Sequence, residues 1–139
     1  FEGRIQYLNK GKLKKILNKN EKLLVDGCHS EASAKNLNEY LKSLNKPIYG
    51  IWGMQKNKQP EKFIKKFKNT FKKIITVTIP NEPNALGAKK LKEISLQNKI
   101  KSETAPNILE ALRICSSSQK KVIVIFGSLY FVGSALAKN

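Results

Sequence analysis

Apolar residues along the chain occur in two kinds of segment, short dense runs and longer stretches with a helical period. The dense runs contain β-branched or aromatic residues, and three of the four adjoin a Pro or a Gly, which is typical of strands. We expect strands at residues 23–25, 48–53, 74–79 and 122–126. Between these runs, apolar positions recur every three or four residues, which indicates helices with one buried face. We expect helices at residues 30–44, 60–71, 88–96 and 107–115.

Two of the predicted helices have clear apolar faces. In the first, Ser30 is well placed as the N-cap. Its apolar face consists of Ala34, Leu37, Leu41 and Leu44. In the second, Pro60 suits the first turn. Its apolar face consists of Phe63, Ile64, Phe67 and Phe71. This spacing predicts that the aromatic rings belong to the core.

The order of the segments predicts the fold class. Residues 122–126, VIVIF, are almost continuously apolar, as expected of a central parallel strand covered on both faces. Strands that alternate with crossover helices indicate an α/β three-layer sandwich, with a mostly parallel sheet flanked by helices. We add a short strand near Ile100. The opening segments GRIQYL and LKKIL, around residues 9–12, are expected to form a hairpin or an edge pair. We expect one domain, residues 1–139, and a monomer.

The formal charge of +17 is not by itself evidence for a specific nucleic-acid partner. Only Arg4 and Arg113 are arginine, and lysine lacks the guanidinium fork with which proteins read bases. Lysine occurs together with abundant Asn and Ile, which are the residues that AT-rich codons specify. Base composition is therefore a sufficient cause of the charge, and we expect no specific nucleic-acid partner.

The longest apolar stretch does not predict a membrane segment. It covers 16 residues, 122–137, and contains two Gly and two Ser, whereas a membrane helix needs roughly 20 apolar residues. A buried strand, a loop and a short helix explain it better. We also find no signal peptide, and because the chain starts at Phe1 we expect a fragment or a processed product.

The two cysteines indicate a reducing compartment. Cys28 and Cys115 form neither a close pair nor a metal-binding pattern, and His29 is the only histidine. We therefore expect reduced structural cysteines, no metal site within the chain, and a cytoplasmic protein.

Two predicted strand ends carry small polar residues. Asp26 to Ser30 follow the first strand, and Gly127 and Ser128 follow VIVIF. In open α/β sheets ligands bind at the carboxyl ends of the strands, and a helix that starts at Ser30 points its free amides to that edge. An anion can bind there, and the Asp26 carboxylate can accept hydrogen bonds from ribose hydroxyls. Gly27 and Gly127 would let a ligand approach the backbone.

Structural explanations remain open at this stage. Asp26 would serve equally well as the cap of a turn. A lone histidine beside an apolar strand is more often a hydrogen-bonded structural residue than a functional one. The spacing alone does not decide between these explanations and a binding site.

Five short sequence segments, in a definite order, make the prediction of function more specific. They are GRIQ, LLVDGCHSEASAKNL, GMQKNKQP, IPNEPNAL and VIVIFGSLYFVGSALAKN. In this order they resemble the C-terminal domain of the bifunctional folylpolyglutamate synthase/dihydrofolate synthase family, which belongs to the Mur-type ATP-dependent ligases. The resemblance covers essentially the whole chain. GSLY and the D-G-x-H element are its most specific parts.

The resemblance implies a function for the parent protein. ATP would phosphorylate a pteroate or folate carboxylate, and L-glutamate would attack the acyl phosphate. The phosphate loop and the Mg²⁺ ligands are expected in an N-terminal ATPase domain, because this chain contains no phosphate-loop sequence. The resemblance therefore implies ATP and Mg²⁺ as cofactors, and a chain that is inactive without that domain.

The resemblance also implies roles for individual residues. Arg4 corresponds to the arginine that reaches the ATP phosphates, and Asp26 to the aspartate near the ribose. His29 and Ser128 correspond to the catalytic pair on the glutamate side. Ser30 and Lys58 are candidates for binding glutamate or phosphate.

Three positions depart from the family pattern. Ser30 stands where asparagine is usual, and Gln59 stands where an aspartate usually pairs with the lysine at Lys58. Glu2 stands where the arginine is usually preceded by proline or a similar residue. An active but diverged enzyme is the interpretation that the resemblance favours.

The alternative function is a basic nucleic-acid or nucleotide-binding α/β module without ligase chemistry. Its support is KKFKNTFKK, residues 65–73, in which two aromatic residues alternate with lysines, as in single-strand binders. On a helix, however, the predicted spacing directs these rings into the core, where they cannot stack on bases.

Overall fold

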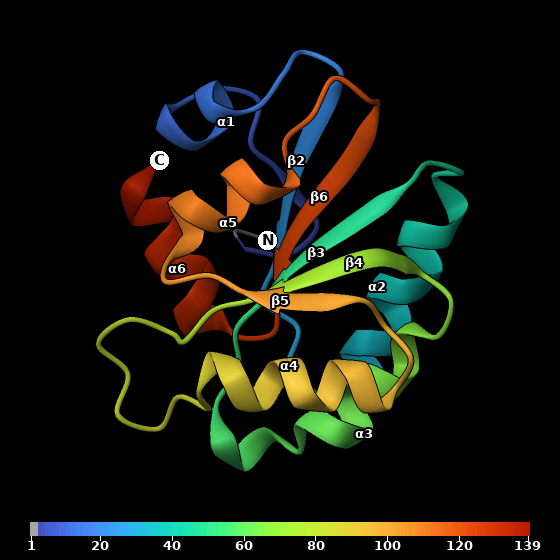
Figure 1. The fold of residues 1–139 in the computed structure, drawn as a ribbon, viewed down its shortest axis with the longest axis vertical. Coiled ribbons are helices and arrows are strands. Elements are labelled where there is room, and N and C mark those ends of the chain that lie inside the picture. Colours follow the sequence, from blue (N-terminus) through green and yellow to red (C-terminus); the bar gives the residue numbers. More distant parts are fainter. Residues whose placement is uncertain (1–2) are drawn as a thin grey trace.

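The computed structural model describes residues 3–139 and contains one sheet with the strand order β1-β2-β6-β3-β4-β5 (Figure 1). The strands are β1 (Gln6–Tyr7), β2 (Glu21–Asp26), β3 (Ile48–Trp52), β4 (Phe71–Thr76), β5 (Ser102–Thr104) and β6 (Lys121–Phe126). The short edge strand β1 pairs antiparallel with β2, and all other pairs are parallel. The predicted mostly parallel sheet is therefore confirmed, and VIVIF lies at its centre.

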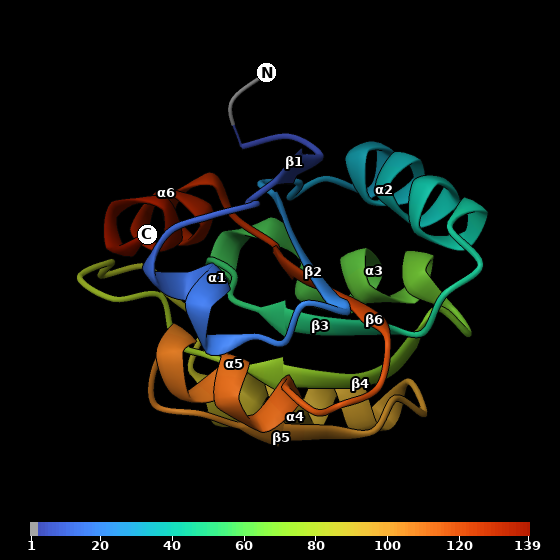
Figure 2. The same cartoon turned by 90° about the horizontal axis from the view of Figure 1, so that it is seen from above.

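Helices cover both faces of the sheet. They are α1 (Lys12–Ile16), α2 (Glu31–Ser43), α3 (Pro60–Ile64), α4 (Ala88–Gln97), α5 (Ile108–Cys115) and α6 (Leu129–Lys138). Apolar residues of α2, α3 and α4 form one core with the sheet, and those of α1, α5 and α6 form a second core on the opposite face. Figure 2 shows α1 and α6 on one side of the sheet and α2 and α3 on the other. The three-layer sandwich is confirmed.

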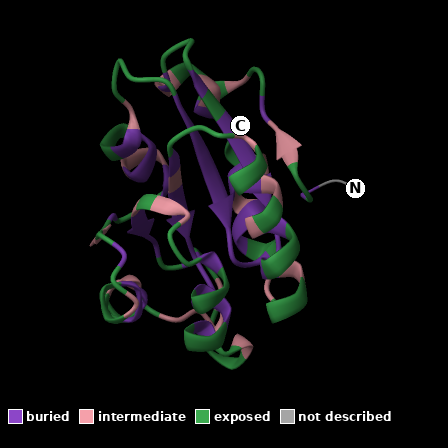
Figure 3. Ribbon diagram, turned by 90° about the vertical axis from the view of Figure 1, so that its right-hand side faces the viewer, coloured by how far each residue is buried: buried purple, intermediate pink, exposed green. Residues whose placement is uncertain are grey.

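Aromatic packing dominates one of the two cores. Trp52, Phe63 and Phe126 stack with ring centroids 6.0–6.3 Å apart, and Phe67 lies 5.3 Å from Phe126. Phe63 and Phe67 are 1% and 0% exposed, so neither ring is accessible for stacking on bases. Figure 3 shows the strands largely buried, whereas the helices keep an exposed outer side.

The predicted helix at residues 60–71 is wrong in its second half. The α-helix ends at Ile64 and continues only as a 3₁₀ turn, Lys65–Phe67. Asn69 then adopts a left-handed conformation with φ 60°, which ends the helical path. Phe71 keeps its contact with Phe67 but is the first residue of β4. The predicted strand at residues 74–79 consequently starts earlier and ends at Thr76, before Pro80.

The predicted pairing of the two opening segments, as a hairpin or an edge pair, is also wrong. LKKIL forms α1, in which Leu13 and the following Leu17 are buried against the α5–α6 side of the sheet. The first amides of α1 donate hydrogen bonds to the last residue of the chain. Leu13 N donates to Asn139 Oδ1 at 3.0 Å, and Lys12 N donates to Asn139 O at 3.2 Å. GRIQYL contributes only the edge strand β1. The strand predicted near Ile100 is β5, and residues 122–137 form the expected strand, loop and helix.

A buried ion pair joins the starts of β2 and β6. Glu21 and Lys121 are 0% and 2% exposed, and Lys121 Nζ lies 2.8 Å from Glu21 Oε2. Burial alone would raise the pKa of Glu21. Hydrogen bonds from Lys121, from the amides of Asn18 and Ser117 and from Ser116 outweigh burial and hold this pKa below its ordinary value.

Within the described part of the chain, the structure agrees with the sequence expectations for the two cysteines and for the lack of a membrane helix. Cys28 and Cys115 are both buried and free. Burial raises the pKa of both thiols, that of Cys115 to about 12, so neither is a reactive thiolate at neutral pH. Over residues 3–139, no helix is long and apolar enough to cross a bilayer.

Candidate functional site

The carboxyl ends of three neighbouring strands are level with one another. Asp26 of β2 pairs with Phe126 of β6, and Phe126 pairs with Trp52 of β3. The segments that follow these strands therefore leave the sheet side by side. The prediction that Asp26 to Ser30 and Gly127–Ser128 meet at one edge agrees with this register.

Asp26 is buried at this edge, with only 3% of its surface exposed. Its Oδ2 accepts a hydrogen bond from Ile5 N at 3.1 Å, and its Oδ1 accepts one from Cys28 N at 2.8 Å. Burial raises the pKa of Asp26, although these amides and the nearby Arg4 guanidinium act in the opposite direction. The carboxylate thus fixes the β2 end against the segment that carries the exposed Arg4.

His29 is half-buried, and its imidazole orientation is defined by one backbone oxygen. Nδ1 lies 3.2 Å from the carbonyl oxygen of Gly27. Because a carbonyl oxygen can only accept, this contact requires the proton on Nδ1. In the neutral ring, Nε2 then carries the free lone pair. His29 N also donates to Ser33 Oγ at 3.2 Å, which ties the residue to the start of α2.

Ser30 is the N-cap of α2, as the sequence predicted. Ser33 N donates to Ser30 Oγ at 3.1 Å, and Ser30 N donates to Ser33 Oγ at 3.1 Å, which completes a capping box. The Ser30 hydroxyl oxygen therefore accepts one hydrogen bond in capping the helix. It remains exposed to solvent at the edge.

One open hollow brings together three of the predicted residues. We call it the 29–58 hollow; it has a volume of about 400 Å³. It is lined by His29, Ser30, Glu31, Asn57, Lys58 and Gln59. Lys58 ends the 3₁₀ turn Lys56–Lys58, and Gln59 is left-handed with φ 52°. The ion pairs found among residues 3–139 do not include Lys58.

A second loop supports the segment that carries Lys58, and sequence reasoning missed it. Lys56 N donates to Asn84 O at 2.8 Å, and Asn84 Nδ2 donates to Asn57 Oδ1 at 2.9 Å. Gln55 Nε2 also donates to Glu82 Oε2 at 3.1 Å. The polar string IPNEPNAL was the available signal, because Asn and Glu between two prolines favour an ordered loop.

Ser128 lies near Asp26 but outside the 29–58 hollow. It is 3% exposed and is the N-cap of α6, where its Oγ accepts a hydrogen bond from Tyr130 N at 3.1 Å. Arg4 and Asp26 do not line the hollow either. The described domain therefore gathers His29, Ser30 and Lys58 in one hollow and holds Asp26 and Ser128 just behind the strand ends.

The expectation that Gly27 and Gly127 leave room for a ligand is wrong in this structure. A Cβ at Gly127, whose φ is +113°, would lie 2.3 Å from the carbonyl oxygen of Gly53. A Cβ at Gly27 would lie 2.3 Å from Leu129 Cδ2. The space saved by both glycines is used for contacts between neighbouring strand ends.

The acidic, histidine and cysteine side chains of residues 3–139 include no group of three or more that could hold a metal ion. Asp26 is already bonded to two amides, and His29 stands alone among histidines. The residues of this domain do not fit a metal site.

Comparison with protein families decides the classification. Residues 9–138 match the family model for the C-terminal domain of dihydrofolate synthetase. The chain belongs to this family. A comparison with curated protein sequences gives no significant match.

Solved structures agree with the fold of this dihydrofolate synthetase C-terminal domain. Mycobacterium tuberculosis folylpolyglutamate synthase, complexed with ADP and AMPPCP, matches 97% of the chain with 18% identity and a TM-score of 0.80. Escherichia coli FolC, in complex with DHPP and ADP, matches 99% with 16% identity and a TM-score of 0.78. A bifunctional folylpolyglutamate synthase/dihydrofolate synthase with Mn, AMPPNP and L-glutamate bound matches 99% with 15% identity and a TM-score of 0.78.

The domain covers 31% of the length of each of these three chains. At these identities the likeness defines the fold of the domain.

Proposed function

We propose that this dihydrofolate synthetase C-terminal domain acts within an ATP-dependent ligase that joins L-glutamate to dihydropteroate or folate. Family membership supports the proposal, as do related folds that bind ADP and AMPPCP, DHPP, or AMPPNP with Mn and L-glutamate. The remaining length of those relatives supports an N-terminal ATPase domain as the partner. The observation that carries the proposal is that Asp26 ends β2, while His29 and Ser128 follow β2 and its in-register neighbour β6.

The proposed reaction has two steps. The substrate carboxylate attacks the γ-phosphorus of ATP, and ADP leaves, which gives an acyl phosphate. The amino group of L-glutamate then attacks the acyl carbon, the C–O bond to phosphate breaks, and the amine loses a proton. The products are the amide, inorganic phosphate and ADP.

Within this scheme, Arg4 and Asp26 serve the nucleotide. The Arg4 guanidinium is exposed and lies close enough to influence Asp26, so it would reach the phosphates, and Asp26 would hold the segment that presents it. A hydroxyl of the ribose would donate a hydrogen bond to a further lone pair of the Asp26 carboxylate.

His29, Ser128, Ser30 and Lys58 serve the amino-acid side. The free Nε2 of His29 suits acceptance of a proton from the attacking amine. In the 29–58 hollow, the Lys58 ammonium and the exposed Ser30 hydroxyl supply donors for a carboxylate or a phosphate. Ser128 would position the α6 start beside the incoming amino acid.

A divalent metal would require ligands outside residues 3–139, because these residues contain no suitable cluster. We assign those ligands and the phosphate loop to the N-terminal domain. The 29–58 hollow is open, so a second domain would be needed to enclose the substrates.

The test is an assay of the full-length protein that carries this domain. We expect ADP release that requires both L-glutamate and a pteroate or folate substrate, with an amide product seen by mass spectrometry. ADP release that is independent of glutamate, or an absence of amide product with every pterin tried, would contradict the proposal.

A further inference from the structure

The edge of the sheet opposite the candidate site has a uniform charge. Five loops lead into the parallel strands at this edge, at residues 17–20, 44–47, 65–70, 98–101 and 116–120. Each of them contains at least one lysine and none contains Asp or Glu. Because the strands are parallel, all five loops lie at their amino-terminal ends, from the top of Figure 1 round to its right-hand side.

Exposed lysines occur in each of these loops and at the start of β4. We call this set the lysine edge, and it consists of Lys19, Lys46, Lys68, Lys72, Lys99 and Lys120, all of which are exposed. Adjacent strands are about 4.8 Å apart, so the five strand starts from β2 to β5 span roughly 19 Å. This length matches several consecutive phosphates of a nucleic-acid backbone, which are spaced by about 3.4 Å along each strand of a duplex.

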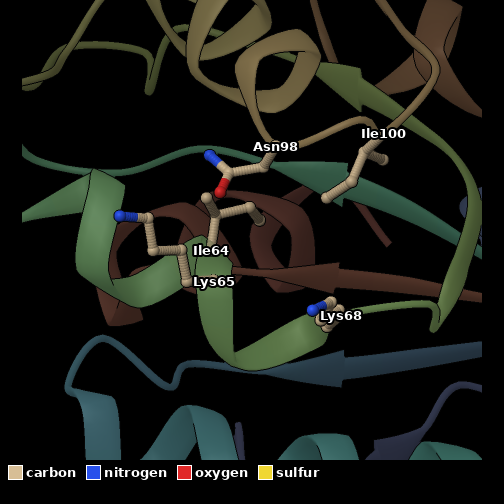
Figure 4. A pocket seen from close by; sticks show the side chains of 5 residues that line it. All are labelled: Ile64, Lys65, Lys68, Asn98 and Ile100. Carbon is tan, nitrogen blue, oxygen red and sulfur yellow. The ribbon is translucent and has the colours of Figure 1, made fainter.

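Two hollows at the lysine edge are lined by cations and neutral polar groups. One, of about 320 Å³, has Lys65, Lys68 and Asn98 around the side chains of Ile64 and Ile100. Figure 4 shows that the lysines come from the turn after α3, and Asn98 and Ile100 from the segment after α4. The other, of about 420 Å³, includes Lys46, Lys72, Asn69 and Thr70. No carboxylate lines either hollow.

The carboxylates of Glu21 and Glu103, on the strands that begin at this edge, do not neutralise this charge. Glu21 is buried and bonded to Lys121, and Glu103 is bonded to Lys73 on the adjacent strand. Helix carboxyl ends also face this edge, but each supplies only about half a negative charge. The opposite edge differs, because it carries Asp26, Glu31 and Glu82 beside its lysines. Base composition explains the number of lysines but not this difference between the two edges.

We propose that the lysine edge binds the phosphate backbone of nucleic acid without reading its sequence. Lysine offers a point charge rather than a fork, so it neutralises phosphates but does not discriminate bases. Phe67, next to Lys68, is buried, and the ring of the half-buried Phe71, next to Lys72, packs against Phe67 and Phe126, so neither provides a stacking platform. A duplex, which has the higher phosphate density, is therefore expected to bind at least as tightly as a single strand.

The test compares two triple variants of the full-length protein that lose the same charge. The edge variant is Lys46→Gln, Lys68→Gln and Lys72→Gln. The control variant is Lys35→Gln, Lys62→Gln and Lys89→Gln, three exposed lysines on helices outside the lysine edge. Neither triple contains a lysine from an observed ion pair.

Binding is measured by fluorescence anisotropy with labelled duplex DNA, and with oligouridylate as the single strand, between about 50 and 200 mM salt. For the duplex, the slope of log K against log salt should become shallower by about 2.7 in the edge variant, at 0.9 per lost contact. At the lowest salt the edge variant should lose at least about tenfold more affinity than the control variant.

A second edge variant, Lys19→Gln, Lys99→Gln and Lys120→Gln, should reproduce this loss if the first one folds poorly by circular dichroism. Equal losses in the edge and control variants would overturn the proposal in favour of diffuse charge. Tighter binding to phosphatidylserine vesicles than to either nucleic acid, lost in the edge variants, would overturn it in favour of a membrane surface.

Discussion

Asp26 and His29 are only three residues apart, but their surroundings differ in a way that bears on function. Both oxygens of Asp26 accept backbone hydrogen bonds, and the side chain is buried. His29 is half-buried, uses Nδ1 for one carbonyl contact and lines an open hollow. We therefore expect that the two residues act on different substrates of the proposed ligase.

This difference predicts separate kinetic effects in the full-length enzyme. Asp26→Ala should mainly weaken the binding of ATP, because it removes a charged hydrogen-bond acceptor. Such an acceptor is worth roughly 1.5–3 kcal/mol, or one to two decades in apparent affinity. His29→Ala should raise the glutamate concentration needed for turnover or slow amide formation, and it should leave the apparent affinity for ATP nearly unchanged. Ser128→Ala should resemble His29→Ala and should also lose about 1 kcal/mol of stability through the α6 cap. Steady-state kinetics with each substrate varied in turn provides the measurement.

Circular dichroism of each variant controls for unfolding. Equal losses for ATP and glutamate in all three variants would show that the roles are wrongly assigned. Unchanged kinetics in His29→Ala would make the histidine a structural residue only.

The buried Glu21–Lys121 pair makes a second prediction at this scale. Lys121→Met should destabilise the domain by about 3–5 kcal/mol, because Glu21 would remain buried without its counter-charge. The double variant Glu21→Gln, Lys121→Met should lose less, since no charge remains buried without a partner and the single glutamine oxygen can still accept a bond from the amide of Asn18 or of Ser117. Urea unfolding of both variants checks this. Equal stability losses would mean that the ion pair itself contributes little.

The same pair gives a pH dependence with a defined direction. The pKa of Glu21 is lowered on folding from its ordinary value of 4.5. Its contribution to the free energy of unfolding is therefore fully present above about pH 4.5, and it is lost as the pH falls through the lower folded value. We expect the stability difference between the wild type and the double variant to shrink below this pH in unfolding measurements.

At the scale of elements, two glycines around α6 should respond in opposite ways. Gly127→Ala should be strongly destabilising, because φ is +113° and the new Cβ would meet the Gly53 carbonyl oxygen at 2.3 Å. Gly133 lies in the exposed part of α6 with no atom within 4 Å of a new Cβ, so Gly133→Ala should stabilise by up to about 1 kcal/mol. Thermal unfolding tests both. A stable Gly127→Ala variant would contradict the proposed close contact between β3 and β6 ends.

The elements that sequence predicted well are those with one consistent signal. VIVIF is apolar throughout and is the buried central strand, and Ser30 precedes a regular apolar period and caps α2. Residues 60–71 carried two signals, because the four-residue spacing of the phenylalanines suits a helix and also spans a turn. Asn69 decided between them through its left-handed conformation, and tertiary packing kept Phe71 beside Phe67. The pattern of LKKIL was too short to distinguish a strand from α1.

Prediction of the candidate site rested on the carboxyl ends of parallel strands and was less complete. A parallel sheet brings all strand carboxyl ends to one edge, so Asp26 and Ser128 were expected at the same edge, whereas the position of β6 directly beside β2 came from the structure. The 29–58 hollow depends on Gln59 turning the chain and on Asn84 bracing Asn57. These are contacts between loops distant in sequence, and no local pattern encodes them.

At the scale of the whole molecule, the open hollow predicts that this chain alone does not turn over. Residues 3–139 provide neither a metal cluster nor an enclosed cleft beside His29, and the sequence contains no phosphate loop. The purified 139-residue chain should therefore show no glutamate-dependent ADP release above a control without pterin. A coupled assay for ADP gives the measurement. Release above that control would mean that one domain suffices.

The position of β6 has a consequence for the time at which the domain can fold. β6 is the last strand of the sequence, but it lies between β2 and β3, and its Lys121 contacts Glu21 across a separation of 100 residues. Until β6 leaves the ribosome, β2 and β3 have no partner along their inner edges. At about 5–20 residues per second, synthesis exposes these apolar edges for several seconds. We therefore expect the central pairs β2–β6 and β6–β3 to form only after β6 has emerged.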